Sequence, residues 1–479
     1  MKMLINGEWV PAQDGRTIVV CNPATLEPID EAPRATPADV DRAVRFAKEG
    51  FRVNRRLPAH QRHGFLVRAG QLILQHYDEL RSLMIRENGK PNRWADFEIR
   101  KTAEIFMTVA ERVKDPHGTT YPMDSMPGCE TDLAMLYRQP RGVVGGIIPF
   151  NFPAEILAYK LAGALAGGNA MVAKLPEDCP LTCLRIGELL LEAGVPPSVF
   201  HLVTGYGEEA GEALVTHPDV PVISFTGSTA VGKRIMEKAA PFLKKLALEL
   251  GGNDPVLVFA DADLELVANN LVHGRMTVGN GQACVADKRF LVEQPVAAEF
   301  TALARAVVSK LRLGDPSDPT VDVGPLIHEA AAQRVENQIL DAVHKGAVVV
   351  TGGRRVNRTF IEPTVLSEVT AEMDLMNHEC FGPVAPILAF QNEEQALGIA
   401  NRSNYGLQGA VYTRDIARAL RVADELEVGG VVINGSSCFR PGNVPFLPRK
   451  ESGLGTDNLF HCVEELTTGK AVVICGVRR

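Results

Sequence analysis

The sequence predicts an α/β fold in which helices cover both faces of a largely parallel sheet. Short apolar runs alternate with segments of helical periodicity, most clearly at 169–174, 181–193 and 198–203. Such alternation is typical of parallel strands joined by crossover helices. A second series of strand-like runs follows toward the C-terminus, so the 479 residues are expected to form more than one domain.

The N-terminal part combines a short β segment with a long helical region. Residues 4–10 and 17–21 flank a polar turn, so they are expected to pair as a hairpin. From 37 to 113 the pattern is helical, and Pro37 in the first turn is typical of a helix start. The segment 133–148 is expected to form strands interrupted by a proline, which cannot donate to a sheet.

The remaining elements follow the same alternation to the C-terminus. Each expected strand is a short apolar run bounded by glycine, proline or polar residues. In chain order these strands lie at 169–174, 198–203, 221–226, 244–250, 255–259, 288–293, 347–351, 384–390, 409–413, 430–434 and 470–475. Helices are expected at 181–193, after Gly227 and at 263–279.

Composition and charge narrow the classes of function. Hydrophobic residues make up 46% and charged residues 23% of the chain, as in soluble globular proteins. The net charge of −8 argues against binding nucleic acid or anionic membranes. No apolar run reaches the roughly 20 residues of a membrane span, and the N-terminus lacks a signal-peptide pattern. The scattered, odd number of cysteines favours reduced thiols in a cytoplasmic enzyme, and no metal site is expected.

Cys284 is the residue that points most directly to chemistry. It ends the glycine-bearing segment 277–284 (TVGNGQAC), and Glu249 precedes it in the segment 247–253 (ALELGGN). A thiol in such a turn can act as a nucleophile, and a carboxylate can be the base that activates water. Together they predict covalent catalysis followed by a hydrolytic step.

Two motifs at the ends of expected strands support this interpretation. Asn151, in 149–153 (PFNFP), could donate its amide to a developing oxyanion, although a turn asparagine between prolines is the simpler reading of it alone. Lys174 and Glu177 follow the strand at 169–174, and ligands of doubly wound sheets bind at such ends. The lysine could hold phosphate or ribose oxygens and the carboxylate a ribose hydroxyl, although such a pair is more often a solvated loop.

Two further motifs suit a dinucleotide. In 225–232 (FTGSTAVG) a strand ends, a glycine permits a close turn and a helix begins, so that free N–H groups could bind a pyrophosphate. This segment is not the GxGxxG fingerprint. In 378–384 (HECFGPV) a carboxylate precedes an aromatic ring. The carboxylate could hold a ribose while the ring lies near a flat cofactor, although the segment in isolation is interpreted as the approach to a strand.

Taken together, these segments resemble the NAD(P)-dependent aldehyde dehydrogenase superfamily over nearly the whole chain and in the family's order. The segments that carry the resemblance are INGEWV (5–10), NPAT (22–25), PFNFP (149–153), 174–177, FTGSTAVG (225–232), LELGGNDP (248–255), GQAC (281–284), ECFGPV (379–384), SNYGLQGAVYT (403–413) and PFLPRKESGLG (445–455). The resemblance implies a Rossmann-like cofactor domain, an α/β catalytic domain and a small β oligomerisation arm.

The resemblance also assigns catalytic roles. Cys284 would attack the aldehyde to give a thiohemiacetal, and Asn151 with the Cys284 N–H would stabilise its oxyanion. Glu249 would activate water to hydrolyse the thioester that remains after hydride transfer. Lys160 would assist proton transfer.

The same resemblance assigns the cofactor contacts. They are Lys174 and Glu177 at the adenosine ribose, Gly227 and Ser228 at the pyrophosphate, Val231 at the adenine, Glu379 at the nicotinamide ribose and Phe381 at the nicotinamide. Because the Glu177 carboxylate would bind a free 2′-hydroxyl and repel a 2′-phosphate, NAD is preferred over NADP, which stays possible. Leu175 departs from the proline usual after this lysine.

The substrate is expected to be a small, polar or anionic aldehyde. The chain resembles the branch that acts on lactaldehyde, succinate semialdehyde, glyceraldehyde 3-phosphate and phosphonoacetaldehyde. Arg440, Arg100 and Lys101 lie where this branch places anion-binding side chains, and Phe152 and Tyr159 would line the tunnel. Ala283 argues against a phosphorylated substrate, because phosphate-binding branches often have arginine there. A solvated surface position is the alternative for at least one of the three basic residues.

Three other functions are weighed against this one. A CoA-acylating dehydrogenase would release the acyl group to CoA, but such relatives usually lack the glutamate at position 249. A hydrolase using Cys284 and Glu249 alone would leave the cofactor motifs unexplained. A non-enzymatic binding or structural protein on this scaffold is disfavoured by the intact Cys284, Glu249 and Asn151.

The family architecture implies the domain limits and the assembly. Residues 1–118 and 142–250 would form the NAD-binding domain and 251–445 the catalytic domain. Residues 119–141 and 446–479 would form the oligomerisation arm and C-terminal segment, whose exposed strand edge would pair subunits into a homodimer or homotetramer. The Leu447-Pro448 pair departs from a glycine pair common in the family and stiffens a loop near the substrate tunnel.

Overall fold

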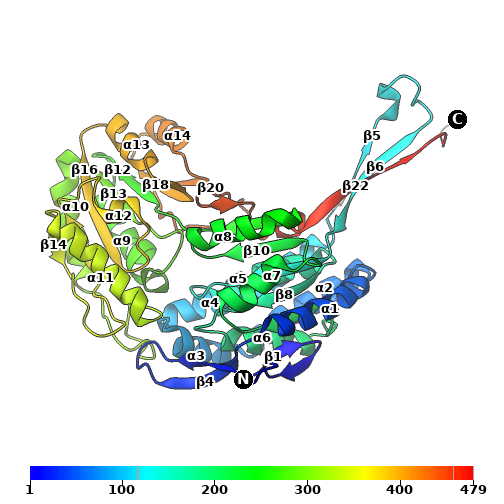
Figure 1. Cartoon of the computed structure of the whole chain (residues 1–479). Helices are drawn as coiled ribbons and strands as arrows, with labels where there is room; N and C mark the ends of the chain where they lie inside the picture. The colour runs from blue at the N-terminus through cyan, green and yellow to red at the C-terminus, as the bar shows by residue number, and fades with distance from the viewer. Residues whose placement is uncertain (116–117, 457, 478–479) are drawn as a thin grey trace.

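Two sheets form the centres of two α/β bodies, and a third, antiparallel sheet extends from the first body as an arm (Figure 1). The structure is a computed structural model that describes residues 1–115, 118–456 and 458–477. The expected segments 1–118 and 446–479 also contain residues 116–117, 457 and 478–479, which lie outside the described residues. The α/β class with parallel-rich sheets is confirmed.

The first sheet has the strand order β2-β1-β9-β8-β7-β10-β11-β21. Its five central strands are parallel and almost wholly buried, while β1, β2 and β21 pair antiparallel at the edges. Such burial on both faces explains the unbroken apolar runs. The bounds are β1 Met3–Ile5, β2 Glu8–Val10, β7 Val143–Ile147, β8 Ala170–Lys174, β9 Phe200–Val203, β10 Val222–Thr226, β11 Lys245–Glu249 and β21 Gly453–Leu454.

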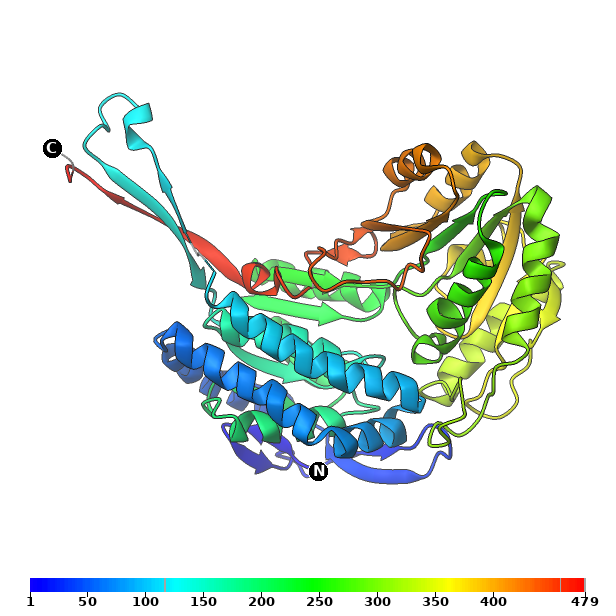
Figure 2. The same cartoon turned by 180° about the vertical axis from the view of Figure 1, so that it is seen from behind.

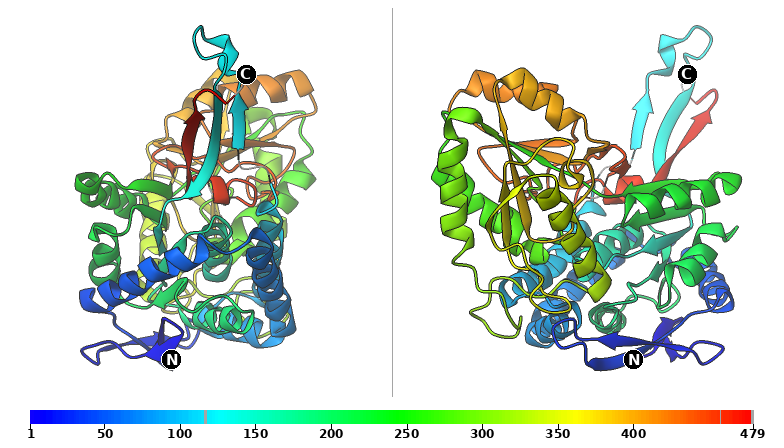
Figure 3. Two further views of the ribbon diagram at one scale, coloured as in Figure 1. Left: turned by 90° about the vertical axis from the view of Figure 1, so that its right-hand side faces the viewer. Right: turned by 60° about the vertical axis from the view of Figure 1, so that its left-hand side comes forward.

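Helices cover both faces of this sheet (Figure 3). One apolar cluster joins the sheet to α1, α7 and α8, and another joins it to α2–α6. The bounds are α1 Pro37–Asn54, α2 Ala59–Gln75, α3 Tyr77–Asn88, α4 Asn92–Arg112, α5 Pro153–Ala166, α6 Leu181–Glu192, α7 Glu212–Thr216 and α8 Thr229–Ala239. The pattern predicted at 37–113 therefore corresponds to four helices.

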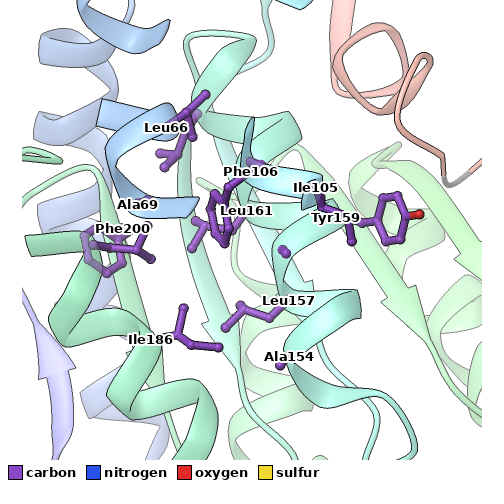
Figure 4. Packing of buried hydrophobic residues seen from close by; sticks show 14 of the residues in the cluster. Leu66, Ala69, Ile105, Phe106, Ala154, Leu157, Tyr159, Leu161, Ile186 and Phe200 are labelled. Atoms are coloured by element: carbon purple, nitrogen blue, oxygen red, sulfur yellow. The ribbon is translucent and has the colours of Figure 1, made fainter. Parts of the chain in front are cut away.

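Helix α5 lies at the centre of the second of these clusters. All but two of its residues are buried, which its largely apolar sequence explains. Figure 4 shows Leu157 and Leu161 within the cluster, whereas the ring of Tyr159 points away from them. The buried helix thus fixes the segment 149–152 that precedes it, and Tyr159 lies on a different face of the helix from Leu157 and Leu161.

The second sheet has the order β14-β15-β16-β13-β12-β18-β19, and all its pairs except β14–β15 are parallel. Its strands are β12 Pro255–Val258, β13 Arg289–Glu293, β14 Val348–Thr351, β15 Thr364–Ser367, β16 Val384–Phe390, β18 Gln408–Tyr412 and β19 Gly430–Ile433. Its helices are α9 Leu264–Leu271, α10 Gln294–Val308, α11 Glu329–His344, α12 Asp374–Asn377, α13 Glu393–Asn401 and α14 Ile416–Glu425. Two apolar clusters again lie on its two faces.

The arm is a three-stranded antiparallel sheet that projects away from both bodies (Figure 2). Strand β6 (Leu133–Pro140) lies between β5 (Gly118–Tyr121) and β22 (Thr467–Ile474). The short helix α15 (Cys462–Glu465) precedes β22, and the small pair β17 (Tyr405–Gly406) and β20 (Arg449–Lys450) lies beside the second sheet. The C-terminal run expected at 470–475 therefore belongs to a longer arm strand.

Three local expectations differ from the structure. The predicted N-terminal hairpin is wrong, because Asn6-Gly7 forms its own tight turn with positive φ and pairs β1 with β2, while β3 (Thr17–Cys21) pairs with β4 (Pro28–Pro33). The helix expected at 263–279 ends at Leu271 and continues as π and 3-10 turns. The segment 133–148 divides between the arm and the first sheet. Within the described residues, no helix is long and apolar enough to cross a membrane.

Candidate active site

A cavity of about 690 Å³ lies between the two bodies, within the size range of ligand sites. Nine of the residues singled out in the sequence line it. They are Asn151, Lys174, Glu177, Gly227, Ser228, Val231, Cys284, Glu379 and Phe381. The structure therefore brings the expected nucleophile and the expected cofactor contacts to one site.

The order of the first sheet explains this convergence. Strands β8, β7, β10 and β11 are adjacent and parallel, so their carboxyl ends meet at one edge. Lys174 ends β8, Gly227 follows β10 and Glu249 ends β11. Ligands of doubly wound sheets bind at this edge.

The part of the cavity at the end of β8 carries an ion pair. Lys174 Nζ donates to Glu177 Oε2, with the lysine buried and the carboxylate partly exposed. The pair leaves the carboxylate accessible as an acceptor for a hydroxyl group.

Helix α8 begins at the same cavity. The Ser228 hydroxyl caps it and accepts a hydrogen bond from the Val231 N–H at 3.4 Å. Gly227 precedes the cap, and all three residues line the cavity. The helix N-terminus offers N–H groups and a favourable dipole to an anion, as a pyrophosphate needs.

The loop before Cys284 has an unusual backbone. Gly279, Asn280 and Gly281 all have positive φ, which only glycine adopts without cost. Asn280 is held in this conformation because its Nδ2 donates to the carbonyls of Gly89 and Pro325, each at 2.9 Å. This fixed turn delivers the partly buried Cys284 to the cavity wall.

Charges near Cys284 act in opposite directions on its thiol. Burial is the largest influence and raises the pKa of Cys284 to about 12. Lys288 and Arg440 act to lower this pKa, whereas Glu379 and Asp254 act to raise it. The thiol is therefore neutral at neutral pH in the absence of ligands, and its reactivity depends on the balance of these charges.

Asn151 is held beside the Cys284 loop. Its Nδ2 donates to the Gln282 carbonyl at 3.0 Å, and its own carbonyl accepts from Lys90 Nζ at 2.7 Å. Lys90 forms a fully buried ion pair with Glu98, which also accepts the Ala154 N–H at 2.9 Å at the start of α5. An amide has a second N–H, which suits it to donate to an oxyanion at this site.

Glu249 and Lys160 lie at a second, smaller cavity. It measures about 10 Å³, room for about one water, and both side chains line it. Lys160 Nζ donates to Ser224 Oγ at 2.9 Å. Glu249 does not line the Cys284 cavity, so the structure separates the expected base from the expected nucleophile.

The part of the cavity around Glu379 and Phe381 combines charge and aromatic rings. Glu379 Oε1 accepts the Gly252 N–H at 3.1 Å and pairs with Lys288 at 3.2 Å. Phe381 packs edge-on against Phe150, with ring centroids 6.0 Å apart. A carboxylate and an aromatic ring thus lie together on the cavity wall.

Arg440 lies over two aromatic rings. Its guanidinium is 4.0 Å from the Phe446 ring centroid and 5.3 Å from that of Tyr159. Its positive charge acts to lower the pKa of the Cys284 thiol, although Arg440 does not line the Cys284 cavity. Phe446 is buried. In the same loop the Leu447 carbonyl packs directly on Gly429. The Leu447-Pro448 pair, which departs from the family's glycine pair, therefore has a packing role.

The other expected substrate residues lie in different surroundings. Phe152 packs on Lys90, with Nζ 3.9 Å from the ring centroid, and contacts the apolar cluster around Ala283. Lys101 pairs with Glu104 at 2.9 Å, and Arg100 is exposed and pairs with Asp96 at 2.9 Å. None of the expected substrate residues Arg440, Arg100, Lys101, Phe152 and Tyr159 lines the Cys284 cavity, and Tyr159 lines the smaller cavity instead.

Three charged residues of this region, Lys288, Lys90 and Glu155, were not predicted from the sequence. Lys288 and Lys90 stand in polar segments that resemble exposed turns, yet both are buried. Glu155 lies in the first turn of α5, one helical turn before Tyr159. Burial raises the pKa of Glu155 to about 7, and the positive charge of Arg440 opposes this shift. Glu155 could have been predicted from its spacing, because a residue four positions before Tyr159 lies on the same face of a helix.

Comparison with known proteins places these features in context. The model of the aldehyde dehydrogenase family matches residues 9–472. The chain is 39% identical to the mitochondrial succinate-semialdehyde dehydrogenase of Arabidopsis thaliana, over 99% of this chain and 89% of that protein. It is 38% identical to the 3-sulfolactaldehyde dehydrogenase of Pseudomonas putida, over 99% and 97%. A solved NADP-dependent enzyme of E. coli superposes with a TM-score of 0.96 at 37% identity, over 99% and 98% of the two chains.

Proposed function

Because the chain belongs to the aldehyde dehydrogenase family, we propose that it oxidises a small, polar or anionic aldehyde to the carboxylic acid with NAD. Family membership makes it an enzyme and removes the non-enzymatic alternative. The observation that carries the proposal is the shared cavity, which Cys284 lines together with Lys174, Glu177 and Glu379.

The residues of the cavity fit a nicotinamide dinucleotide. Lys174 and Glu177 would hold the adenosine ribose, the start of α8 the pyrophosphate, and Glu379 with Phe381 the nicotinamide riboside. When bound, the cofactor supplies the acceptor for the hydride of the aldehyde.

The chemical steps fall to three side chains. The Cys284 thiol would lose its proton to water as Sγ bonds to the carbonyl carbon, and the oxyanion formed would accept hydrogen bonds from the Asn151 amide and the Cys284 N–H. After loss of the hydride, a thioester remains on Cys284. Glu249 would take a proton from the water that attacks this thioester, which releases the acid and the free thiol. Because Glu249 lies in a separate cavity, its side chain or the water must move between the two steps.

Preference for NAD is supported by Glu177. Its partly exposed carboxylate in the cavity would accept a hydrogen bond from a 2′-hydroxyl and repel a 2′-phosphate. Relatives of known structure include NADP-dependent and NAD-dependent enzymes, so the family alone does not choose. Glu177→Gln should therefore raise NADP use relative to NAD.

An anionic substrate is supported by Arg440. Its charge acts on the Cys284 thiol, and it packs over aromatic rings that would enclose a small carbon chain. The named relatives act on semialdehydes and sulfolactaldehyde, whose far ends carry an acid group. A carboxylate or sulfonate is thus the end group that Arg440 suits.

The arm supports an oligomer. Its strands present exposed backbone edges and apolar side chains such as Tyr121 and Val473 away from both bodies. An exposed edge of this kind is a template for pairing with another chain. A homodimer or a homotetramer formed through the arm is the proposed assembly.

The proposal is tested with a panel of small aldehydes and both cofactors, following absorbance of the reduced cofactor. The panel contains neutral, hydroxylated, carboxylated, sulfonated and phosphorylated members. Oxidation of the anionic members with NAD, and its loss in Cys284→Ala with cofactor binding retained, is the expected result. Turnover by Cys284→Ala, or a preference for neutral aldehydes, would contradict it, and acyl transfer to added CoA would favour the CoA-acylating alternative.

A further inference from the structure

Lys288 is a buried cation directly behind the cavity wall. Its side chain is 1% exposed and does not line the cavity, whereas Cys284 and Glu379 do. A buried ammonium group is stable only where anions and carbonyl groups satisfy it. The contacts of the Lys288 ammonium group therefore indicate its role in the structure.

Lys288 contacts two residues of the proposed site, Cys284 and Glu379. Lys288 Nζ donates to the backbone carbonyl of Cys284 and pairs with Glu379 Oε1 at 3.2 Å. Gly251 lies alongside, and a Cβ there would come 2.5 Å from Glu379 Oε2, so glycine leaves the carboxylate its place. One ammonium group thus bridges the main chain of the nucleophile and the carboxylate of the nicotinamide end.

Four charged groups act on the pKa of the Cys284 thiol, and of the two cations Lys288 has the larger effect. Lys288 and Arg440 favour the thiolate, while Glu379 and Asp254 oppose it. Glu379 therefore has two effects, since it pairs with Lys288 and itself disfavours the thiolate. Hydrogen bonds donated to Glu379 by a ribose would disperse its charge and shift the balance toward Lys288.

We propose that Lys288 is a positioning residue that holds the main chain of Cys284 and couples occupation of Glu379 by the cofactor ribose to the reactivity of the thiol. The inference rests on the proposed function, in which Cys284 is the nucleophile and Glu379 contacts the cofactor. Lys288 would act on a bound ligand through these two neighbours, because it does not itself line the cavity.

The test follows alkylation of Cys284 by iodoacetamide against pH, with and without NAD, by mass spectrometry of the Cys284 peptide. Lys288→Met removes the charge at similar length, and Lys288→Arg keeps it. In Lys288→Met, alkylation at neutral pH should fall about tenfold or more, because one pKa unit changes the thiolate fraction tenfold. NAD should no longer accelerate the reaction, whereas Lys288→Arg should largely restore both properties. Lys345→Met, at an exposed lysine, is the matched control.

A second variant keeps the test decisive if Lys288→Met does not fold. Glu379→Gln removes the opposing charge and leaves the lysine, so its Cys284 should react faster than wild type without NAD and gain nothing from NAD. Profiles of folded Lys288→Met, or of Glu379→Gln, that coincide with wild type would overturn the inference alone. If alkylation of wild-type Cys284 does not stop aldehyde oxidation, the proposed function fails first and the inference with it.

Discussion

The carbonyl oxygen of Cys284 lies 2.6 Å from the point that a Cβ atom would occupy on Gly252. Side chains essentially never approach a backbone oxygen so closely, so only glycine fits beneath the nucleophile. Gly252 also donates its N–H to Glu379. Gly252, the second glycine of the segment 248–255 (LELGGNDP), thus sets how closely the Cys284 loop approaches the edge of the first sheet.

Gly252→Ala should therefore displace the Cys284 loop. Because a shift of about 1 Å in a reacting group costs roughly 100-fold, kcat should fall by about that factor with the fold intact. Steady-state kinetics and circular dichroism check this. Gly398→Ala is the control, since a Cβ there meets no atom within 4 Å, and it should keep wild-type kcat. A Gly252→Ala enzyme with wild-type kcat would show that the loop adapts.

Glu249→Gln should let an acyl-enzyme accumulate. The amide keeps the shape of the side chain but cannot take a proton from water, so hydrolysis of the thioester slows. Intact-protein mass spectrometry after mixing with NAD and aldehyde should show a Cys284 adduct absent in wild type. Glu465→Gln, which alters another carboxylate of the same small cavity, should show none. Undiminished turnover of Glu249→Gln would require a different base.

Arg440→Ala should raise KM for anionic aldehydes by roughly tenfold to a hundredfold and change KM for neutral ones little. The expected size follows from the loss of a hydrogen bond between charged groups, about 1.5–3 kcal/mol. Arg100→Ala, at an exposed arginine paired with Asp96, should leave both values unchanged. Equal effects of Arg440→Ala on both substrate classes would reduce it to a packing residue.

The affinity for anionic aldehydes should depend on pH through Glu155. Burial raises the pKa of Glu155 to about 7, so this carboxyl is mostly neutral below that pH and mostly charged above it. Once charged, it repels an anionic substrate and competes for Arg440, so KM should rise as the pH rises through about 7. In Glu155→Gln the rise should disappear. A pH profile unaltered by this substitution would separate Glu155 from the substrate.

Lys90→Met should destabilise the protein. Its partner Glu98 is 0% exposed, and an unpaired buried carboxylate costs about 3–5 kcal/mol. Urea unfolding measures the change. Lys114→Met, which removes an exposed ion pair with Glu111, should change the free energy of unfolding little. Similar losses for the two variants would mean that Glu98 finds another partner or becomes protonated.

The sequence predicted the parts of the site that depend on strand order. Lys174, Gly227 and Glu249 stand at the ends of apolar runs, and parallel strands place such ends at one edge. Residues whose role depends on tertiary pairing could not be found in this way. Lys90 and Lys288 have the local sequence of solvated turns, and only Glu98 and Glu379, brought by other elements, make them internal.

Side-chain direction was the other limit. Glu249 ends its strand as expected, but the path of the chain turns it toward Lys160 rather than into the Cys284 cavity. The N-terminal pairing was wrong for a similar local reason, since the Asn6-Gly7 turn closes a hairpin earlier than the polar segment suggested.

The crossing of the C-terminal segment between the two bodies has a mechanical consequence. Strand β20 pairs beside the second sheet and β21 pairs in the first, with only two residues between them. The carbonyl of Ser452 accepts from Leu250 N at 2.9 Å and its hydroxyl from Gly406 N at 3.0 Å. Three Cα steps span at most about 11 Å, so the bodies cannot part at this point. Any motion of the two bodies relative to each other would therefore be a rotation that leaves Ser452 nearly in place, rather than a separation at this point.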